Sequence, residues 1–192
     1  MNILAPFALA LCLAAPAAQA TVVNFDDLSG DGSVADGYGG ITWGNNWQHY
    51  DDSQNPYNPS SPFQRIYADS SVFGNTFQGT SFSFLTDVAF GGAYFAGYGS
   101  SDGFASVFFE LFSNGVSVFS TASLDVNSTP TFLGASYAGL IDQVVVWGTA
   151  GYYVMDDVSY TATAPVPLPA ALPLLLAALG GLGIAGRRRP RL

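Results

Sequence analysis

The sequence predicts an all-β protein whose central domain is an antiparallel β-sandwich. Residues 21–164 contain 27 aromatic residues and 18 glycines but one glutamate and no lysine, so strong helix formers are scarce there. Short apolar runs of strand length alternate with Gly, Asn, Asp, Ser and Pro, the residues that favour turns. No long stretch carries apolar side chains at the helical period. The domain is also long enough to close the core of such a sandwich.

The expected strands follow one another at short spacing. They lie at residues 22–25, 40–43, 65–68, 81–85, 88–95, 105–112, 116–120, 131–133, 143–147 and 152–161. Residues 113–115 are Ser-Asn-Gly, which predicts a tight hairpin turn between the strands on either side. Phe82 and Phe84 alternate with serines, so their strand is expected to have one buried and one wet face. Residues 106–112 and 144–147 are apolar on both faces and are therefore expected to form central strands.

Residues 1–20 have the features of a secretory signal peptide. The run 3–15 is apolar and uncharged, and it is too short to span a bilayer core of roughly 30 Å. Ala18 and Ala20 provide the small side chains that signal peptidase requires before a cleavage site, so we expect the mature chain to begin at Thr21. The single cysteine lies inside this leader, which leaves the exported domain without disulfides or thiolate zinc sites.

Residues 165–192 carry a second apolar segment. Residues 168–186 are uncharged, and as a helix they would reach roughly 28 Å, enough to cross the hydrocarbon core. Arg187, Arg188 and Arg189 follow at once. Because positive residues stay on the cytoplasmic side, this C-terminal transmembrane helix is expected to run from outside to inside. The alternative is a permanent C-terminal membrane anchor.

The order of these parts resembles a known sorting signal. The proline motif that precedes the apolar helix consists of Val166, Pro167, Leu168, Pro169 and Ala170. Together with the helix and the arginine cluster, it resembles the VPLPA-type variant of the PEP-CTERM sorting signal. The resemblance implies that an inner-membrane exosortase is a partner, in addition to the signal peptidase that the leader requires, and that the helix anchors the chain only transiently. It also implies a Gram-negative bacterium that makes exopolysaccharide, and a final location at the cell surface or outside the cell.

Three short motifs in the central domain resemble a group of secreted jelly-roll domains that often accompany such signals. They are F-D-D-L at 25–28, Y-G-G-I-x-W at 38–43 and V-M-D-D-V-x-Y at 154–160. These domains are similar to carbohydrate-binding modules. The resemblance therefore implies a jelly-roll-like sandwich and names polysaccharide as a ligand class.

The same resemblance implies a structural calcium ion where the terminal strands of the domain meet. Its candidate ligands are Asp26, Asp27, Asp156 and Asp157, with Asp31 and Asp36 as further candidates. Adjacent residues on a strand face opposite sides, so only one aspartate of each pair can face a given surface unless a bulge intervenes. If the valines that flank it face the core, Asp156 is buried and needs a metal or backbone N–H groups as partners. The alternative is that these aspartates cap turns and solubilise the strand ends.

Residues 43–57 form a polar and aromatic segment without a regular pattern. Sugar binding uses this mixture, in which a flat aromatic face lies beneath the ring C–H groups and amides or carboxylates hold the hydroxyls. The candidate ligand-binding residues are Trp47, Tyr50, Asp51 and Asn46, with Tyr57 and Asn45 beside them. The alternative is a long ordered loop whose aromatic side chains pack on the edge of the sandwich.

Side chains that could catalyse a reaction are few. His49 is the only histidine, which excludes two-histidine metal centres, and we expect its side chain to be solvated. No G-x-S-x-G motif surrounds any serine. Glu110, the sole glutamate, is expected to face solvent or to pair with Arg65, and no pair of carboxylates stands out for glycoside hydrolysis. We therefore expect that the protein is not an enzyme. A glycoside hydrolase remains the weakest of the three functions considered.

The net charge of the central domain limits its partners. Residues 21–164 hold fourteen acids and one base, a formal charge of −13, whereas four of the five arginines lie in the last six positions. A domain this acidic repels phosphate backbones, so nucleic acid is not expected as a partner. The sequence predicts an exported, non-catalytic structural or adhesive β-sandwich of the cell surface or exopolysaccharide matrix. The alternative is a calcium-dependent glycan-binding module in that matrix.

Overall fold

The computed structural model describes residues 19–69, 71, 74–104 and 106–163 of the 192-residue chain. The sorting signal with its transmembrane helix, and the signal peptide except its last two positions, lie outside these residues. Among the described residues, no helix has the length and apolar character that crossing a membrane requires.

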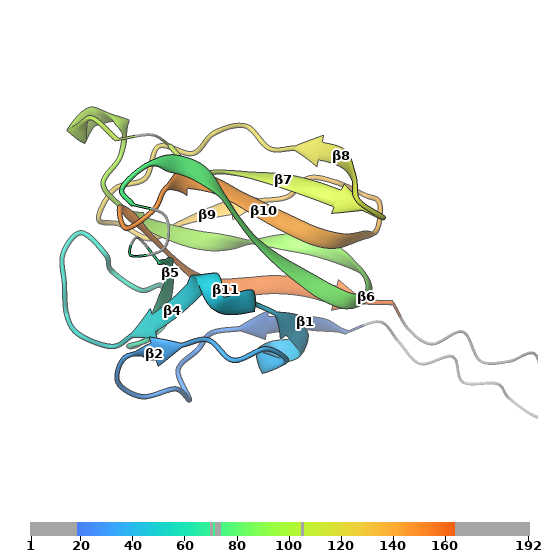
Figure 1. Ribbon diagram of the computed structural model, residues 1–192, viewed down its shortest axis with the longest axis horizontal. Coiled ribbons are helices and arrows are strands. Elements are labelled where there is room, and N and C mark those ends of the chain that lie inside the picture. Colours follow the sequence, from blue (N-terminus) through green and yellow to red (C-terminus); the bar gives the residue numbers. More distant parts are fainter. Residues whose placement is uncertain (1–18, 70, 72–73, 105, 164–192) are drawn as a thin grey trace, which may run out of the picture. The chain divides into compact units, whose positions relative to one another are not determined.

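Antiparallel strands make the described part of the chain an all-β fold (Figure 1). The eleven strands among the described residues are β1 (Ala20–Val23), β2 (Gly32–Ser33), β3 (Ile41–Thr42), β4 (Trp47–Tyr50), β5 (Arg65–Ala68), β6 (Phe77–Gly97), β7 (Phe108–Ser113), β8 (Val116–Ser120), β9 (Thr131–Gly134), β10 (Ile141–Thr149) and β11 (Tyr153–Ala162). Short 3₁₀ turns occur at Tyr38–Gly40, Gly44–Asn46 and Ser100–Asp102. The predicted all-β, antiparallel, sandwich-like architecture is confirmed.

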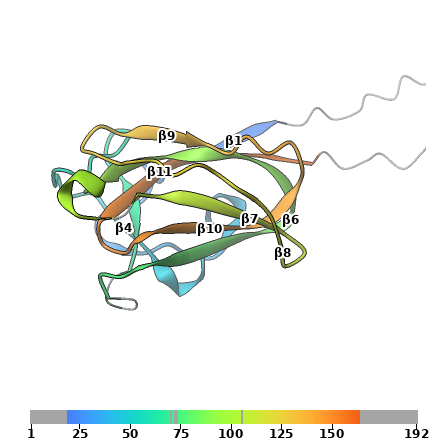
Figure 2. The same cartoon turned by 90° about the horizontal axis from the view of Figure 1, so that it is seen from above.

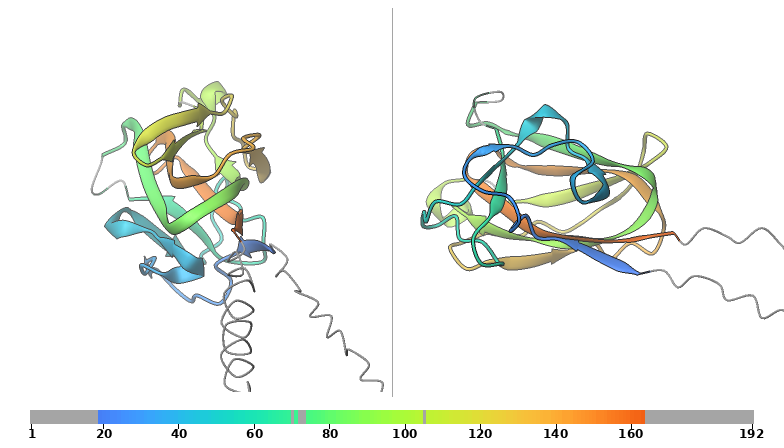
Figure 3. Two further views of the ribbon diagram at one scale, coloured as in Figure 1. Left: turned by 90° about the vertical axis from the view of Figure 1, so that its right-hand side faces the viewer. Right: turned by 90° about the horizontal axis from the view of Figure 1, so that it is seen from below.

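The long strand β6 joins the two layers of the fold. Its first part pairs with β10 and its last part pairs with β11. The exposed residues 85–87 lie between these parts, and Figures 2 and 3 show how the strand curves from one layer to the other. One layer therefore holds β10, β7 and β8 in that order, and the other holds β11, β5, β4 and β2. The terminal strand β1 pairs with β11, while β3 and β9 pair with β6.

The prediction of two separate strands at 81–85 and 88–95 was wrong, because they are parts of β6. Ile141 of β10 pairs with Val88 beyond the bend, and Gln143 pairs with Ser83 before it. Hydrogen bonding to one partner strand therefore continues across the exposed bend.

Alternating side chains fill the space between the layers. Phe82 and Phe84 are buried, as predicted, while Ser81 and Ser83, which alternate with them, are half-buried on the other face. The predicted central strands lie in β10, between β6 and β7, and in β7, between β10 and β8. Both strands bury one face more fully than the other, with Val144 and Val146 inside and Trp147 half-exposed.

Two backbone positions illustrate how local sequence shapes the sheets. Asn114 and Gly115 have φ values of 52° and 75°, the left-handed conformations that a tight hairpin turn between β7 and β8 requires. The predicted hairpin is confirmed. Gly92 has a φ of 134°, and a Cβ atom there would lie 2.2 Å from the carbonyl oxygen of Leu133. The missing side chain thus lets β9 approach β6.

Strand β4 corrects the prediction of an irregular segment over residues 43–57. Its side chains alternate, with Trp47 and His49 buried and Gln48 and Tyr50 half-exposed. It pairs with β5 on one side and with β2 on the other. The prediction considered only the polar and aromatic composition of the segment. It overlooked that Trp47 and His49 alternate with Gln48 and Tyr50 at the period of a strand.

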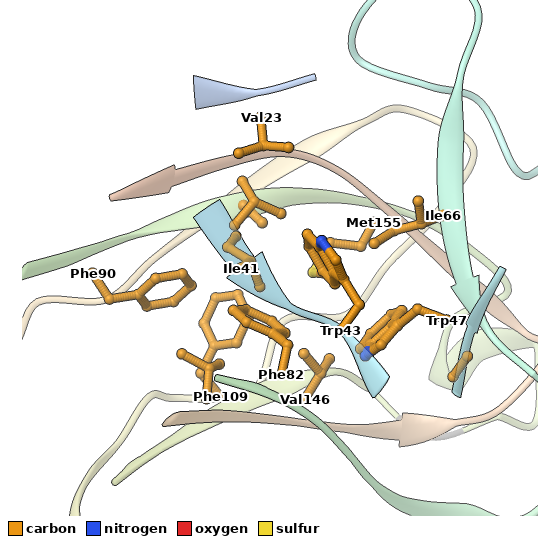
Figure 4. Close-up of a cluster of buried hydrophobic side chains, with 14 of the residues drawn as sticks. Val23, Ile41, Trp43, Trp47, Ile66, Phe82, Phe90, Phe109, Val146 and Met155 are labelled. Atoms are coloured by element: carbon orange, nitrogen blue, oxygen red, sulfur yellow. The ribbon is translucent and has the colours of Figure 1, made fainter. Parts of the chain in front are cut away.

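Trp47 belongs to the core, which Figure 4 shows together with Trp43, Phe82 and their neighbours. The Trp47 side chain is 0% exposed, and its Nε1 donates a hydrogen bond of 3.0 Å to the carbonyl oxygen of Ser81. Its ring centroid lies 6.2 Å from those of both Trp43 and Phe82. A buried indole offers no face to a sugar, so the predicted ligand-binding role of Trp47 was wrong.

Candidate functional site

The first and last strands of the domain meet, which is the arrangement that the calcium hypothesis expected. β1 pairs with β11 along its whole length. Near this junction Phe25 and Asp157 adopt left-handed conformations, with φ values of 61° and 49°. The register between β11 and β6 shifts directly after Asp156. Because of this bulge, both aspartates of the second pair reach the loop at residues 60–64.

Asp156 accepts hydrogen bonds from three backbone N–H groups and from two serine hydroxyls, each of which shares its single proton with a second acceptor. Its Oδ2 accepts from the backbone N–H groups of Ser60 and Ser61, both at 2.9 Å, and from their hydroxyls at 3.1 and 3.0 Å. Its Oδ1 accepts from the backbone N–H of Asp157 at 2.7 Å. The residue is 2% exposed, as expected for a position between two inward valines. Burial raises the pKa of Asp156 to about 6 and the charge of Asp157 acts in the same direction, whereas the N–H donors favour the charged form.

The other aspartates of the predicted calcium site are also hydrogen-bond acceptors. Asp26 Oδ1 accepts from the N–H groups of Phe63 and Gln64 at 3.2 and 3.4 Å. Asp157 Oδ2 accepts from the hydroxyl of Ser60 at 2.7 Å. Asp27 accepts from the hydroxyl of Tyr38. We name the set formed by Asp26, Asp156, Asp157 and the loop at 60–64 the aspartate clamp.

The hydrogen bonds of the aspartate clamp do not fit a calcium ion at its centre. Calcium needs carboxylate and carbonyl oxygens with free lone pairs, whereas Asp156 Oδ2 already accepts from two backbone N–H groups and faces two serine hydroxyls. A cation at that oxygen would meet the positive ends of these dipoles. Within the described ranges, no cluster of three or more acidic, histidine or cysteine side chains is arranged to hold a metal. Backbone N–H groups, the other partner that the sequence allowed, satisfy the buried carboxylate.

A cleft of about 350 Å³ opens beside β4 and β5, and we name it the tyrosine cleft. Its lining residues are Asp31, Tyr50, Asp52, Gln54, Tyr57, Tyr67, Gly151, Tyr153 and Val154. They come from the segment before β2, from β4 and the loop after it, from β5, from the turn between β10 and β11, and from the start of β11. That loop and that turn lie at the same end of the sandwich, on the left in Figure 1.

Contacts with the protein fix the tyrosine rings of this cleft. The Tyr57 hydroxyl donates a hydrogen bond of 2.8 Å to the carbonyl oxygen of Gly151. The rings of Tyr50 and Tyr67 meet edge to face, with centroids 5.4 Å apart and planes at 86°. The guanidinium of Arg65 lies 3.8 Å from the centre of the Tyr50 ring. A ligand would therefore meet rings that are already in place, which lowers the entropy cost of binding.

The tyrosine hydroxyls of the cleft are held in the neutral form. Burial raises the pKa of Tyr57 to about 12. Burial also raises the pKa values of Tyr50 and Tyr67, and the charge of Asp31 acts in the same direction on both. The hydroxyls of Tyr50 and Tyr67 can therefore both donate and accept hydrogen bonds at neutral pH, whereas the Tyr57 hydroxyl donates to Gly151 and can only accept from a ligand.

Of the four predicted ligand-binding residues, Trp47 is buried in the core, and the other three lie at different places. Tyr50 lines the cleft, and so does its neighbour Tyr57. Asp51 is exposed, and its Oδ2 accepts a hydrogen bond of 2.8 Å from the backbone N–H of Gly30, outside the cleft lining. Asn46 lies in a 3₁₀ turn away from the lining, where its carbonyl oxygen accepts from the N–H of Asp69 at 2.9 Å.

Sequence reasoning missed Asp52, Gln54 and Tyr67, and it considered Asp31 only as a metal ligand. Tyr67 stands between the buried Ile66 and Ala68 on a strand that was predicted with its observed bounds. Its outward position could therefore have been deduced. The location of Asp31 could not have been deduced from the sequence, because it depends on how the segment before β2 packs beside β5.

Two polar residues that were considered for catalysis are part of the packed structure. His49 is 8% exposed rather than solvated, and its Nδ1 has no hydrogen-bond partner among the described residues. Glu110 does not pair with Arg65 as one alternative had it. Its carboxylate accepts from the hydroxyl of Ser117 at 2.6 Å and from Nε1 of Trp147 at 3.0 Å.

Comparison with known proteins gives no assignment for this site. No protein-family model, curated protein or solved structure matches the chain. The site is therefore interpreted from its own geometry.

Proposed function

We propose that this chain is an exported protein of the cell surface or extracellular matrix, whose β-sandwich binds glycan through the tyrosine cleft without catalysing a reaction. The observation that carries the proposal is a concave, preformed site where tyrosine rings lie beside carboxylates and an amide. This combination suits a sugar, because the C–H faces of a pyranose pack on aromatic rings while its hydroxyls need donors and acceptors.

The cleft supports a binding role better than a purely structural one. Tyr50, Tyr57 and Tyr67 are half-exposed at its wall, although the core of the same domain takes up many other aromatic side chains. Rings held in place by Arg65 and by the Gly151 carbonyl keep their shape without a ligand. An adhesive protein of a polysaccharide matrix would use such a site to hold the matrix.

A non-catalytic role is favoured by the location of the perturbed carboxyl group. Glycoside hydrolysis uses an acid whose pKa is raised, placed across the scissile bond from a second carboxylate. Burial raises the pKa of Asp156, but that side chain holds the loop at 60–64 and is not among the residues that line the cleft. Calcium is not part of the proposal, because the aspartate clamp is satisfied by N–H and O–H donors.

The export and sorting of the chain are the second part of the proposal. Signal peptidase would remove the leader, and an exosortase would act on the segment at 165–192 after its helix has anchored the chain in the inner membrane. These steps are based on the apolar segments and on the resemblance of the proline motif to the PEP-CTERM signal. They require a Gram-negative host and deliver the domain to polysaccharide outside the cell.

Titration with soluble polysaccharides tests the binding function. Tyr67→Ala removes one ring from the cleft, and Tyr137→Ala removes a partly buried ring that stacks on Phe119 elsewhere. We expect Tyr67→Ala to weaken binding by about tenfold, which corresponds to about 1.4 kcal/mol, and Tyr137→Ala to leave it unchanged. Absence of saturable binding to any glycan in a broad panel would refute the glycan-binding function.

A further inference from the structure

We propose that the ligand of the tyrosine cleft carries a protonated amine, as the amino sugars of partly deacetylated polysaccharides do. This inference rests on the proposed glycan binding and names the class of glycan. It follows from the charges that the cleft presents to a ligand and from the aromatic rings beside them.

Two carboxylates of the cleft are open to a ligand. Asp31 and Asp52 both line it, and both are exposed. In the part of the chain that the structure describes, neither carboxylate accepts a hydrogen bond, unlike Asp51 next in the chain, which binds a backbone N–H. Asp31 lines the same cleft as Tyr50 and Tyr67, and its charge adds to burial in raising the pKa values of both.

The base nearest to the cleft, Arg65, offsets only part of these two negative charges. Arg65 is 1% exposed, and its guanidinium donates to the carbonyl oxygens of Phe63, at 3.1 Å, and of Asp52. It also lies against the ring of Tyr50. Burial raises the pKa of Tyr50, but the positive charge of Arg65 acts to lower it and so offsets part of the negative charge of the cleft. Because Arg65 is buried, the exposed Asp31 and Asp52 are the charged groups that a ligand can contact.

An ammonium group suits this environment in two ways. Carboxylates attract it directly, and the faces of neutral tyrosine rings attract it through the ring quadrupole. The formal charge of −13 over residues 21–164 adds a long-range attraction for cations and repels uronic or phosphorylated glycans. A neutral sugar would leave both carboxylates without a partner of opposite charge.

Paired glycans of equal length test this inference in titrations of the full chain. We expect a chitosan oligomer, which carries free amines, to bind at least about tenfold more tightly than the fully acetylated chitin oligomer at low salt and slightly acidic pH. Added salt should reduce the difference, because it screens exposed charges. Asp31→Asn and Asp52→Asn should each weaken chitosan binding, whereas Asp102→Asn, on a 3₁₀ turn outside the cleft lining, should not.

A lysine oligomer of equal charge separates recognition from non-specific attraction to an acidic protein. Binding of the peptide as tight as that of chitosan, or unchanged chitosan binding by Tyr67→Ala, would overturn the inference. Equal or tighter binding of chitin, lost in Tyr67→Ala, would also overturn it but would leave the proposed glycan-binding function intact. Failure of every glycan to bind would remove both.

Discussion

Removal of the Asp156 carboxylate should destabilise the fold by an amount that the structure allows to be calculated. Asp156→Ala leaves the N–H groups of Ser60, Ser61 and Asp157 without their acceptor. These groups are only partly buried, so each lost hydrogen bond costs about 1 kcal/mol, the low end of the usual range. The expected loss of unfolding free energy is therefore about 3 kcal/mol. The measurement is made at pH 5, where Asp156, with a pKa of about 6, is mostly protonated. At higher pH, Asp156→Ala would also remove an unfavourable buried charge, and this gain would mask part of the loss.

Urea unfolding followed by tryptophan fluorescence measures this loss, since Trp43 and Trp47 are buried in the native state. The slope of the transition should stay the same while its midpoint falls. Asp36→Ala is the matched control, because the exposed Asp36 accepts one hydrogen bond of 2.7 Å from the N–H of Gly44 and should cost about 1 kcal/mol or less. A loss below about 1 kcal/mol for Asp156→Ala, or a calcium-dependent rise in the stability of the unmodified chain that Asp156→Ala abolishes, would refute the clamp.

The remaining predictions concern pH, one glycine and processing. Burial raises the pKa of Asp156 from 3.8 to about 6, so the folded state binds more protons than the unfolded state between these values. The contribution of Asp156 to stability should therefore be largest below about pH 4 and fall by up to about 3 kcal/mol as the pH rises through 6, and Asp156→Asn should remove this component in urea titrations. Gly92→Ala should lower the free energy of unfolding by more than about 1 kcal/mol, because its Cβ would lie 2.2 Å from the carbonyl oxygen of Leu133. Gly30→Ala, whose Cβ would have no atom within 4 Å, should lower it less in the same assay. Mass spectrometry of the secreted protein should find a chain that begins at Thr21 and ends near the proline motif, and an intact C-terminal arginine cluster would contradict processing.

Much of the fold follows from patterns a few residues long. Alternation of Phe82 and Phe84 with serines placed one face of β6 inside, and Ser-Asn-Gly at 113–115 produced the hairpin between β7 and β8. The inward position of Asp156 also followed from its neighbours, because Val154 and Val158 are buried on either side of it. In each case the pleat of a strand, or the φ values of a turn, transmits the pattern directly into structure.

Only the tertiary structure decided which side chains form the site. Trp47 is in the core because the pleat of β4 turns it inward, but the pairing of β4 with β2 and β5 that forms this part of the layer cannot be deduced from local propensity. The tyrosine cleft joins Asp31, Tyr67 and Gly151, which are far apart in the chain. Their proximity depends on the bend of β6, on the order of strands in each layer and on the packing of loops, all of which are long-range effects. The sequence by itself thus determined that the domain is an antiparallel sandwich rich in aromatic and acidic residues. The packing of distant segments determined which of these side chains line the cleft.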